Sequence, residues 1–246
     1  MPLFDQKTMD HFALGSDFAF SATRIGALGA AEYTLVGIAV DASPSVGPFK
    51  DREESCIAEI VKACRRSPRA DNLMLRVSQF NATVTEIHGF KPLLACNPSD
   101  YKDALKISGA TAAFDAAKNQ LGALLQYGRD LKAADLTVNA ITFVITDGED
   151  NVSKSTTLEV RETLRQARKE ESLDSVLAVL VGVNVKEASV SAALQKFRDE
   201  AGFDAYIEID NADEAALARL ASFASRSIQA QSKALGTGAT ARVVGF

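Results

Sequence analysis

The chain alternates between short runs of apolar residues and longer stretches in which apolar residues recur every three or four positions. Residues 33–40 and 138–146 are nearly continuous apolar runs, and an aspartate follows each of them directly. A strand that is buried on both faces of a parallel sheet has this pattern. We therefore predict that both segments are central strands of one sheet.

Further strands and helices alternate along the rest of the chain. Residues 73–80 and 83–88 are strand-like runs separated by Asn81-Ala82, which predicts an antiparallel hairpin. Residues 175–183 and 205–209 are two further strands. Helical periodicity, with start and stop signals such as a capping box at Thr156 and Gly128 as a stop, predicts helices near 51–66, 111–128, 156–169, 190–201 and 211–230.

Strands and helices that alternate in this way predict an α/β fold. We expect a doubly wound, mostly parallel sheet of six strands, with one antiparallel edge strand and helices on both faces. Since no repeat or linker divides the chain, we predict one domain over residues 31–230, an N-terminal extension over 1–30 and a C-terminal tail over 231–246.

The two terminal segments leave alternatives open. Residues 18–25 (FAFSATRI) and 240–246 (TARVVGF) both have the composition of extended chain. One hypothesis is that they pair with each other or with a neighbouring subunit, so that the extensions support oligomerisation. The alternative is a mobile arm that becomes ordered only on a partner.

Composition narrows the classes of function. The formal net charge is −5 and the Lys and Arg residues are scattered, which disfavours nucleic acid because phosphate binding needs a basic surface. We see no secretory signal pattern, and no run approaches the roughly 18–20 apolar residues that span a bilayer. Three cysteines and two histidines lack the spacing of a disulfide framework or a zinc site. We therefore expect a cytoplasmic protein that binds neither nucleic acid nor a membrane.

Three polar motifs stand at the ends of predicted elements. Residues 41–45 (DASPS) follow the first central strand, residues 146–148 (TDG) end the second, and residues 108–111 (SGAT) lead into the helix before it. If the two strands are neighbours, all three motifs meet at the carboxyl edge of the sheet, where open α/β sheets bind ligands. The sequence therefore predicts one polar site built from three distant segments.

Together, the Asp-x-Ser-x-Ser motif, a later Thr and a still later Thr-Asp-Gly resemble the metal ion-dependent adhesion site (MIDAS) of the von Willebrand factor type A (VWA) family. The resemblance covers residues 33–230 and includes the order of the motifs along the chain. This chain departs from the family at Pro44, where Gly is usual, and a proline fixes one backbone angle and removes a donor.

The resemblance implies a set of oxygen ligands. Ser43 and Ser45 would bind the cation directly, Thr111 would do so at least in the ligand-bound form, and Asp41 and Asp147 would act partly through water. Hydroxyls, carboxylates and waters are hard ligands, which suit Mg²⁺ best here and Mn²⁺ or Ca²⁺ as alternatives. The predicted cofactor is therefore Mg²⁺.

The same resemblance implies protein binding without catalysis. A cation held by neutral hydroxyls and few carboxylates can accept a further Asp or Glu from a partner protein, and Glu149 and Asp150 either contact that partner or only add negative potential. In bacteria the family often works with ring-forming ATPases, which makes such an ATPase one expected partner. We expect an adaptor or a subunit of a larger assembly.

Two rival functions stay open. One is a structural, self-assembling subunit with a vestigial metal site. The other is a magnesium-dependent phosphoryl-transfer enzyme with Asp41 as nucleophile or metal ligand, but it needs a second acid where Ser43 stands, and no Gly-rich phosphate loop is present. Because we also find no set of nucleophile, base and orienting residue, we predict that the protein is not an enzyme.

Overall fold

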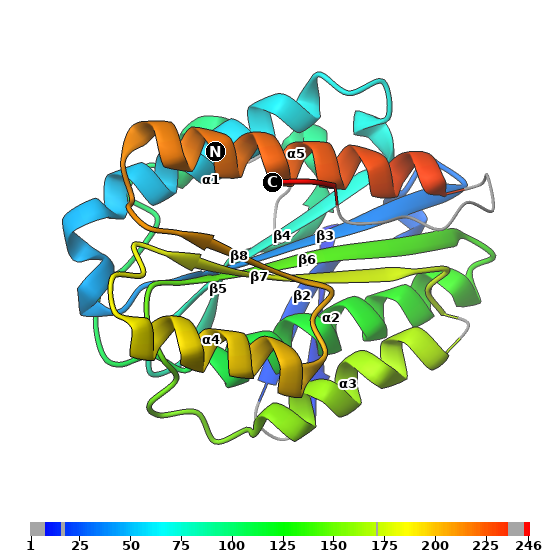
Figure 1. The fold of residues 1–246 in the computed structure, drawn as a ribbon. Helices are drawn as coiled ribbons and strands as arrows, with labels where there is room; N and C mark the ends of the chain where they lie inside the picture. The colour runs from blue at the N-terminus through cyan, green and yellow to red at the C-terminus, as the bar shows by residue number, and fades with distance from the viewer. Residues whose placement is uncertain (1–7, 16–17, 171, 236–243) are drawn as a thin grey trace.

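The computed structural model describes residues 8–15, 18–170, 172–235 and 244–246. One sheet of eight strands, in the order β1-β2-β5-β4-β3-β6-β7-β8, forms the centre of the molecule (Figure 1). The strands are β1 (Met9–Leu14), β2 (Phe18–Thr23), β3 (Glu32–Asp41), β4 (Leu73–Phe80), β5 (Val84–Pro92), β6 (Thr137–Thr146), β7 (Val176–Val183) and β8 (Ala205–Ile209).

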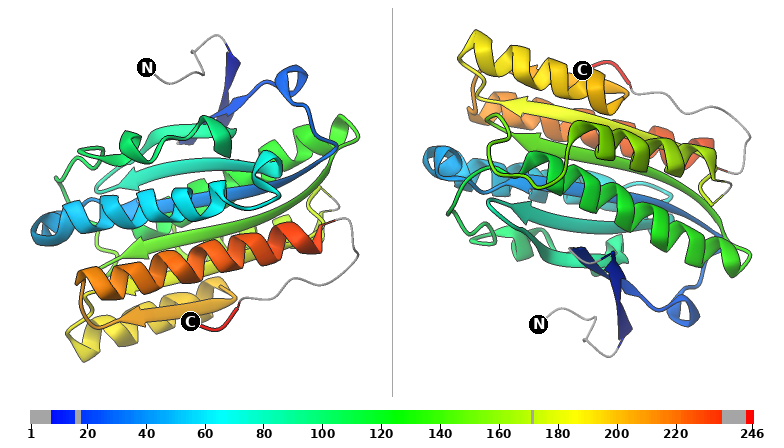
Figure 2. Two further views of the ribbon diagram at one scale, coloured as in Figure 1. Left: turned by 90° about the horizontal axis from the view of Figure 1, so that it is seen from above. Right: turned by 90° about the horizontal axis from the view of Figure 1, so that it is seen from below.

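Helices cover both faces of this sheet. The α-helices are α1 (Lys50–Arg65), α2 (Ala113–Ala133), α3 (Thr157–Lys169), α4 (Ala188–Ala201) and α5 (Glu214–Ala234). Short 3-10 turns are η2 (Ile25–Ala27), η3 (Pro44–Phe49), η4 (Ala70–Asn72), η5 (Leu93–Ala95) and η6 (Pro98–Tyr101). Helices α1 and α5 lie on one face, and α2, α3 and α4 lie on the other (Figures 1 and 2). Within the described ranges, no helix is long and apolar enough to cross a membrane.

The central strand β3 shows why its sequence is apolar throughout. It lies between β4 and β6 and is parallel to both. Val36 and Ile38 belong to the apolar cluster shared with α1 and α5, whereas Leu35 and Ala39 belong to the cluster shared with α2, α3 and α4. Because alternate side chains point to opposite faces and both faces are covered, every position from Tyr33 onwards is buried.

The predicted mixed α/β architecture is confirmed, but the predicted number of six strands is wrong. All six predicted strands form, including the antiparallel β4–β5 pair. Two more strands, β1 and β2, form an antiparallel hairpin that extends the sheet beyond β5, and β2 joins β5 in parallel through the pair Ala22–Phe90. Residues 9–14 and 18–23, which fall in the predicted N-terminal extension, therefore belong to the sheet.

One hypothesis paired the FAFSATRI segment with the TARVVGF segment or with a neighbouring subunit. Residues 18–23 are extended as expected, but their pairing partners are β1 and β5. Residues 240–243 of the second segment lie outside the described residues. At the end of the chain, Phe246 packs edge-on against Phe223 of α5, with ring centroids 5.6 Å apart. No pairing between the two terminal segments is seen in the described part of the chain.

Helix α2 does not stop at Gly128 as predicted and continues to Ala133. Leu173 packs directly over Gly128, and a Cβ atom at this position would lie 2.5 Å from Leu173 Cδ2. A glycine in a helix allows a neighbouring side chain to approach closely, as well as serving as a stop signal. Here it is required by packing, so the helix passes through it.

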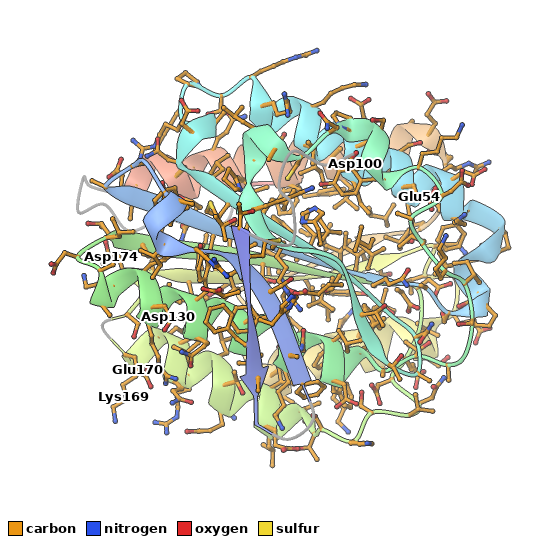
Figure 3. All side chains as sticks on the ribbon, turned by 180° about the vertical axis from the view of Figure 1, so that it is seen from behind. Glu54, Asp100, Asp130, Lys169, Glu170 and Asp174 are labelled. Carbon is orange, nitrogen blue, oxygen red and sulfur yellow. The ribbon has the colours of Figure 1, made fainter. Side chains whose placement is uncertain are left out.

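A polar cluster that we call the hairpin latch, made of Ser21, Arg76 and Glu86, fastens the β1–β2 hairpin to the sheet. The backbone N–H and the hydroxyl of Ser21 both donate to Glu86, at 3.1 and 2.5 Å. Arg76 is fully buried and donates to the same carboxylate at 2.7 Å and to Asn119 Oδ1 at 2.7 Å. In Figure 3 the two hairpin strands cross the foreground, steeply inclined to the other strands. The latch compensates for the short β2–β5 pairing.

Candidate metal centre

The carboxyl ends of β3 and β6 bring two of the polar motifs together. These strands are parallel neighbours, paired up to Val40 and Ile145. Asp41 is the last residue of β3 and Thr146 the last residue of β6. The two central strands are therefore neighbours, which is the condition for the motifs to meet, and the DASPS and TDG motifs start side by side.

The DASPS loop turns back on itself immediately after β3. The N–H of Ser43 donates to Asp41 Oδ1 at 2.8 Å, and this short-range bond sets the direction of the turn. Pro44 then opens η3, with the N–H of Val46 donating to the carbonyl of Ser43 at 3.1 Å. At the first position of a helical turn an N–H has no partner within the turn, so proline fits. The turn brings the hydroxyls of Ser43 and Ser45 within 2.9 Å of each other.

Two hydrogen bonds connect this loop to the end of β6. Ser45 Oγ donates to Asp147 Oδ1 at 2.8 Å, and Thr146 Oγ1 donates to Asp41 Oδ2 at 2.6 Å. The structure therefore joins Asp41, Ser43, Ser45 and Asp147 into one hydrogen-bonded group. Thr146 was not among the predicted site residues, although it stands in the TDG motif, and its role is to fix the Asp41 carboxylate.

The SGAT segment lies between these two loops. The N–H of Ser108 donates to the carbonyl of Ala42 at 3.0 Å. The N–H of Thr111 donates to Asn151 Oδ1 at 2.9 Å, and the carbonyl of Thr111 accepts from the N–H of Asn151 at 3.0 Å. Gly109 has a φ of 74°, a left-handed conformation that a residue with a side chain rarely adopts. Thr111 is therefore held at the site by its backbone, and within the described residues its hydroxyl has no hydrogen bond to the other four predicted ligands.

The two acids after the TDG motif have different surroundings. Glu149 is exposed. Asp150 accepts a hydrogen bond from the N–H of Phe114 at 3.1 Å and another from the hydroxyl of Ser153, so it fixes the start of α2. A surface hollow of about 370 Å³ lies beside them, with Phe114 and Phe197 in its lining. Glu149 is thus available to a partner, whereas Asp150 is bonded internally.

The electrostatics of the group fit a bound cation. Asp41 is fully buried, and this burial raises its pKa to about 6, although the bonds from Thr146 and Ser43 act in the opposite direction. Burial also raises the pKa of Asp147. In the part of the chain that the structure describes, no Lys or Arg influences either carboxylate. A buried and a half-buried acid side by side, without a counter-charge, are a favourable place for a divalent cation.

The donor set is rich in hydroxyls. Among the described residues, no group of three or more His, Cys, Asp and Glu side chains is arranged to hold a metal. A cation here would be bound by Ser43, Ser45 and Asp147, with Asp41 behind them and Thr111 nearby. All of these groups are oxygen ligands, which hard cations such as Mg²⁺ prefer.

Glu53, in the first turns of α1, is a residue of this region that the sequence interpretation missed. It is 2% exposed, and both of its carboxylate oxygens lack a hydrogen-bond partner among the described residues. Burial raises its pKa well above the usual value, and the nearby charges of Asp41 and Asp147 raise it further. The sequence did contain a signal for its burial. Glu53 precedes Cys56 by three residues and Ile57 by four, so it lies on the same apolar face of the helix as these two residues.

Comparisons with known proteins show the fold. No protein-family model and no curated protein matches the sequence. The minor pilin PilB from Streptococcus sanguinis is 14% identical, with 89% of this chain and 66% of that chain covered and a TM-score of 0.58. The pilus adhesin SpaC from Lactobacillus rhamnosus GG is 11% identical, with 82% and 31% covered and a TM-score of 0.58.

A third similar structure is proximal thread matrix protein 1 from the mussel byssus, described as having a zinc-occupied MIDAS motif. It is 18% identical, with 81% of this chain and 46% of that chain covered and a TM-score of 0.52. The present chain thus spans between 31% and 66% of the length of these three proteins. At these identities the likeness establishes a common fold.

Proposed function

We propose that this chain is a VWA domain that binds Mg²⁺ at a MIDAS and uses the cation to hold a carboxylate of a partner protein. The observation that carries the proposal is the hydrogen-bonded series from Ser43 through Ser45 to Asp147, which joins residues 102 positions apart in the sequence. These are the side chains that the family resemblance names as ligands. The oxygens that hydrogen-bond to one another here are the ones that would bind the cation.

The exposure of the group favours binding to an external ligand. Asp41 and Ser43 are buried and form a floor, while Ser45 is exposed and Asp147 is half-buried. A cation above this floor would have coordination positions open to solvent. Since most of its protein ligands are neutral hydroxyls, it would keep positive charge for an incoming Asp or Glu.

The metal-occupied MIDAS of the mussel protein supports a metal at this edge of the fold. That protein is described as binding zinc in its motif. For the present chain Mg²⁺ is the preferred cation, with Mn²⁺ or Ca²⁺ as alternatives, because hard oxygen ligands make up the group.

The environment of Asp41 supports binding over phosphoryl transfer. Asp41 is fully buried, and each of its two oxygens already accepts a hydrogen bond, from the N–H of Ser43 and from Thr146. A carboxylate that attacks phosphorus needs an accessible oxygen in line with the leaving group. The proposed role is therefore non-enzymatic.

A pull-down from a lysate of the source cells tests the function. Wild type and Ser43→Ala are each used as bait with Mg²⁺ and with a chelator. Ser189→Ala, which changes an exposed serine in the first turn of α4, is the matched control for the loss of a hydroxyl. We expect a protein partner, such as a ring-forming ATPase, to be retained only by wild type and Ser189→Ala in Mg²⁺.

Retention of the same partner in all conditions would contradict a metal-bridged complex. That result would instead favour the structural, self-assembling subunit, with contacts through the terminal extensions. Calorimetry with MgCl₂ on the same three proteins identifies the step that fails, because Ser43→Ala should lose cation binding even without a partner.

A further inference from the structure

Two consecutive buried acids, Glu53 and Glu54, lie near the start of helix α1, and their environments differ. Glu54 accepts hydrogen bonds from the N–H groups of Asp103 and Leu105, at 2.8 and 2.9 Å. Figure 3 labels Glu54, at the end of α1 that lies beside this loop. Its carboxylate is fully used in fixing the loop after η6, so the role of Glu54 is structural.

Glu53 has no such use within the described residues. It is 2% exposed, neither of its oxygens accepts a hydrogen bond, and the charges that act on it are those of other acids, Asp41 and Asp147 foremost. A buried carboxylate is costly unless a donor or a cation compensates it. The described residues supply neither, so a cation or a water molecule from outside the chain is the candidate for the compensating group.

The position of Glu53 relative to the metal centre limits what that group can be. Within the described ranges, Asp41, Asp147 and Glu53 do not form a cluster that could hold an ion by carboxylates alone. This leaves a contact through a water molecule as the way in which Glu53 would interact with a cation. A water molecule on a divalent cation is a strong hydrogen-bond donor because the cation polarises its O–H bonds, and carboxylates commonly accept from such groups around metal sites.

We propose that Glu53 is part of the metal centre, where its carboxylate accepts a hydrogen bond from a water molecule bound to the cation. The inference rests on the proposed metal binding by Ser43, Ser45 and Asp147. Glu53 is then a positioning residue that orients one water ligand and adds a third acid to the surroundings of the cation. This role accounts for both of its features, the burial and the missing partner.

The test compares Glu53→Gln and Glu53→Met with wild type, and uses Glu59→Gln as the control. Glu59 lies on the same helix but is about half exposed and pairs with Lys62, so its substitution changes charge without affecting the centre. Proteins stripped with a chelator are titrated with MnCl₂ and MgCl₂ by calorimetry. We expect both Glu53 variants to bind Mn²⁺ about 10- to 100-fold more weakly, as is usual for outer-shell partners, and Glu59→Gln to bind like wild type.

Thermal unfolding of the metal-free proteins separates this role from a structural one. Because Glu53 has no partner among the described residues, metal-free Glu53→Met should be at least as stable as wild type. A Glu53→Gln protein that folds and binds Mn²⁺ with wild-type affinity would overturn the inference and leave the proposed function intact. Wild type that binds neither cation would overturn both. Failure of both Glu53 variants to fold would assign the residue to structure and also overturn the inference.

Discussion

His88 is a residue whose protonation affects the stability of the fold. Its Nδ1 lies 2.9 Å from the carbonyl oxygen of Gly89, and its Nε2 lies 2.9 Å from the hydroxyl of Tyr101. Burial, reinforced by the charge of Lys91, lowers the pKa of His88 to about 3. The folded protein therefore holds this imidazole neutral at pH values where an unfolded chain protonates it.

We expect the stability that depends on neutral His88 to be fully present above the unfolded pKa of about 6.5 and to be lost as the pH falls towards 3. Between pH 7.5 and 5.5 the loss is roughly 1 kcal/mol. Urea unfolding of wild type and His88→Phe in chelator measures it, and the variant should show a flatter dependence on pH. Equal slopes for the two proteins would contradict the assignment.

Gly37, in the centre of β3, allows a close approach between the sheet and α2. A Cβ atom at this position would lie 1.8 Å from the Nε2 atom of Gln120, a fully buried residue that also accepts a hydrogen bond from Arg76. Gly37→Ala should destabilise the protein by about 2 kcal/mol or more, as for other overpacked cores. Gly26→Ala is the control, because nothing lies within 4 Å of a Cβ atom there. Chemical denaturation of both variants measures the difference.

The site was predictable from sequence to the extent that its residues stand in local motifs. Asp41 and Asp147 directly follow apolar runs, and Ser43 comes two residues after Asp41, so a strand assignment also places them at the edge of the sheet. Glu53 was not predictable in the same way. An acid on a helix is usually solvated, and only the packing of α1 against the sheet buries it beside Asp41.

At the scale of elements, the hairpin latch explains how two N-terminal strands join a sheet that is otherwise formed by later segments. Glu86 is 21% exposed and Arg76 is fully buried, so the ion pair between them is largely shielded from water. Glu86 also accepts both hydrogen bonds of Ser21. Glu86 thus provides one part of the polar attachment of the hairpin, and the bonds of Thr23 with Phe90 and Tyr127 provide another.

Glu86→Ala should destabilise the protein by about 3–5 kcal/mol, because it leaves the buried Arg76 charge without its partner. Glu162→Ala, which removes a surface ion pair with Arg165, should change the stability little, because water screens an exposed pair. Chemical unfolding of both variants gives the comparison, and hydrogen exchange should show that Ser21 and its neighbours in β2 lose protection first. An equal effect of the two substitutions would contradict the role of the latch.

The elements that sequence predicted well are those whose burial is uniform along the chain. The strands β3, β6 and β7 are buried at nearly every position and were evident as apolar runs. Strand β1 alternates between half-buried and exposed positions, and β2 is attached through distant residues such as Glu86 and Tyr127. The pattern of apolar and polar residues within a short segment does not show which distant residues will bind that segment. For this reason the sheet was predicted with six strands instead of eight.

At the scale of the whole molecule, cation binding should stabilise the fold by mass action. A ligand that binds only the folded state adds about 2.7 kcal/mol when its concentration is one hundred times its dissociation constant. For a chain of this length that corresponds to a rise in the unfolding temperature of about 5–10 °C. Thermal unfolding with increasing MgCl₂ should show this rise for wild type and not for Ser45→Ala. An equal rise in both proteins would place the effect outside the proposed centre.

The separation of Ser45 and Asp147 along the chain determines the stage of folding at which the proposed metal centre can form. Their hydrogen bond spans 102 positions, and it requires β3 and β6 to be already paired in parallel. Contacts between such distant residues form late in folding, because a long loop must first be closed. The cation would therefore be acquired by a finished fold and not by a nascent chain. Its identity would reflect the ions of the surroundings in which folding is completed.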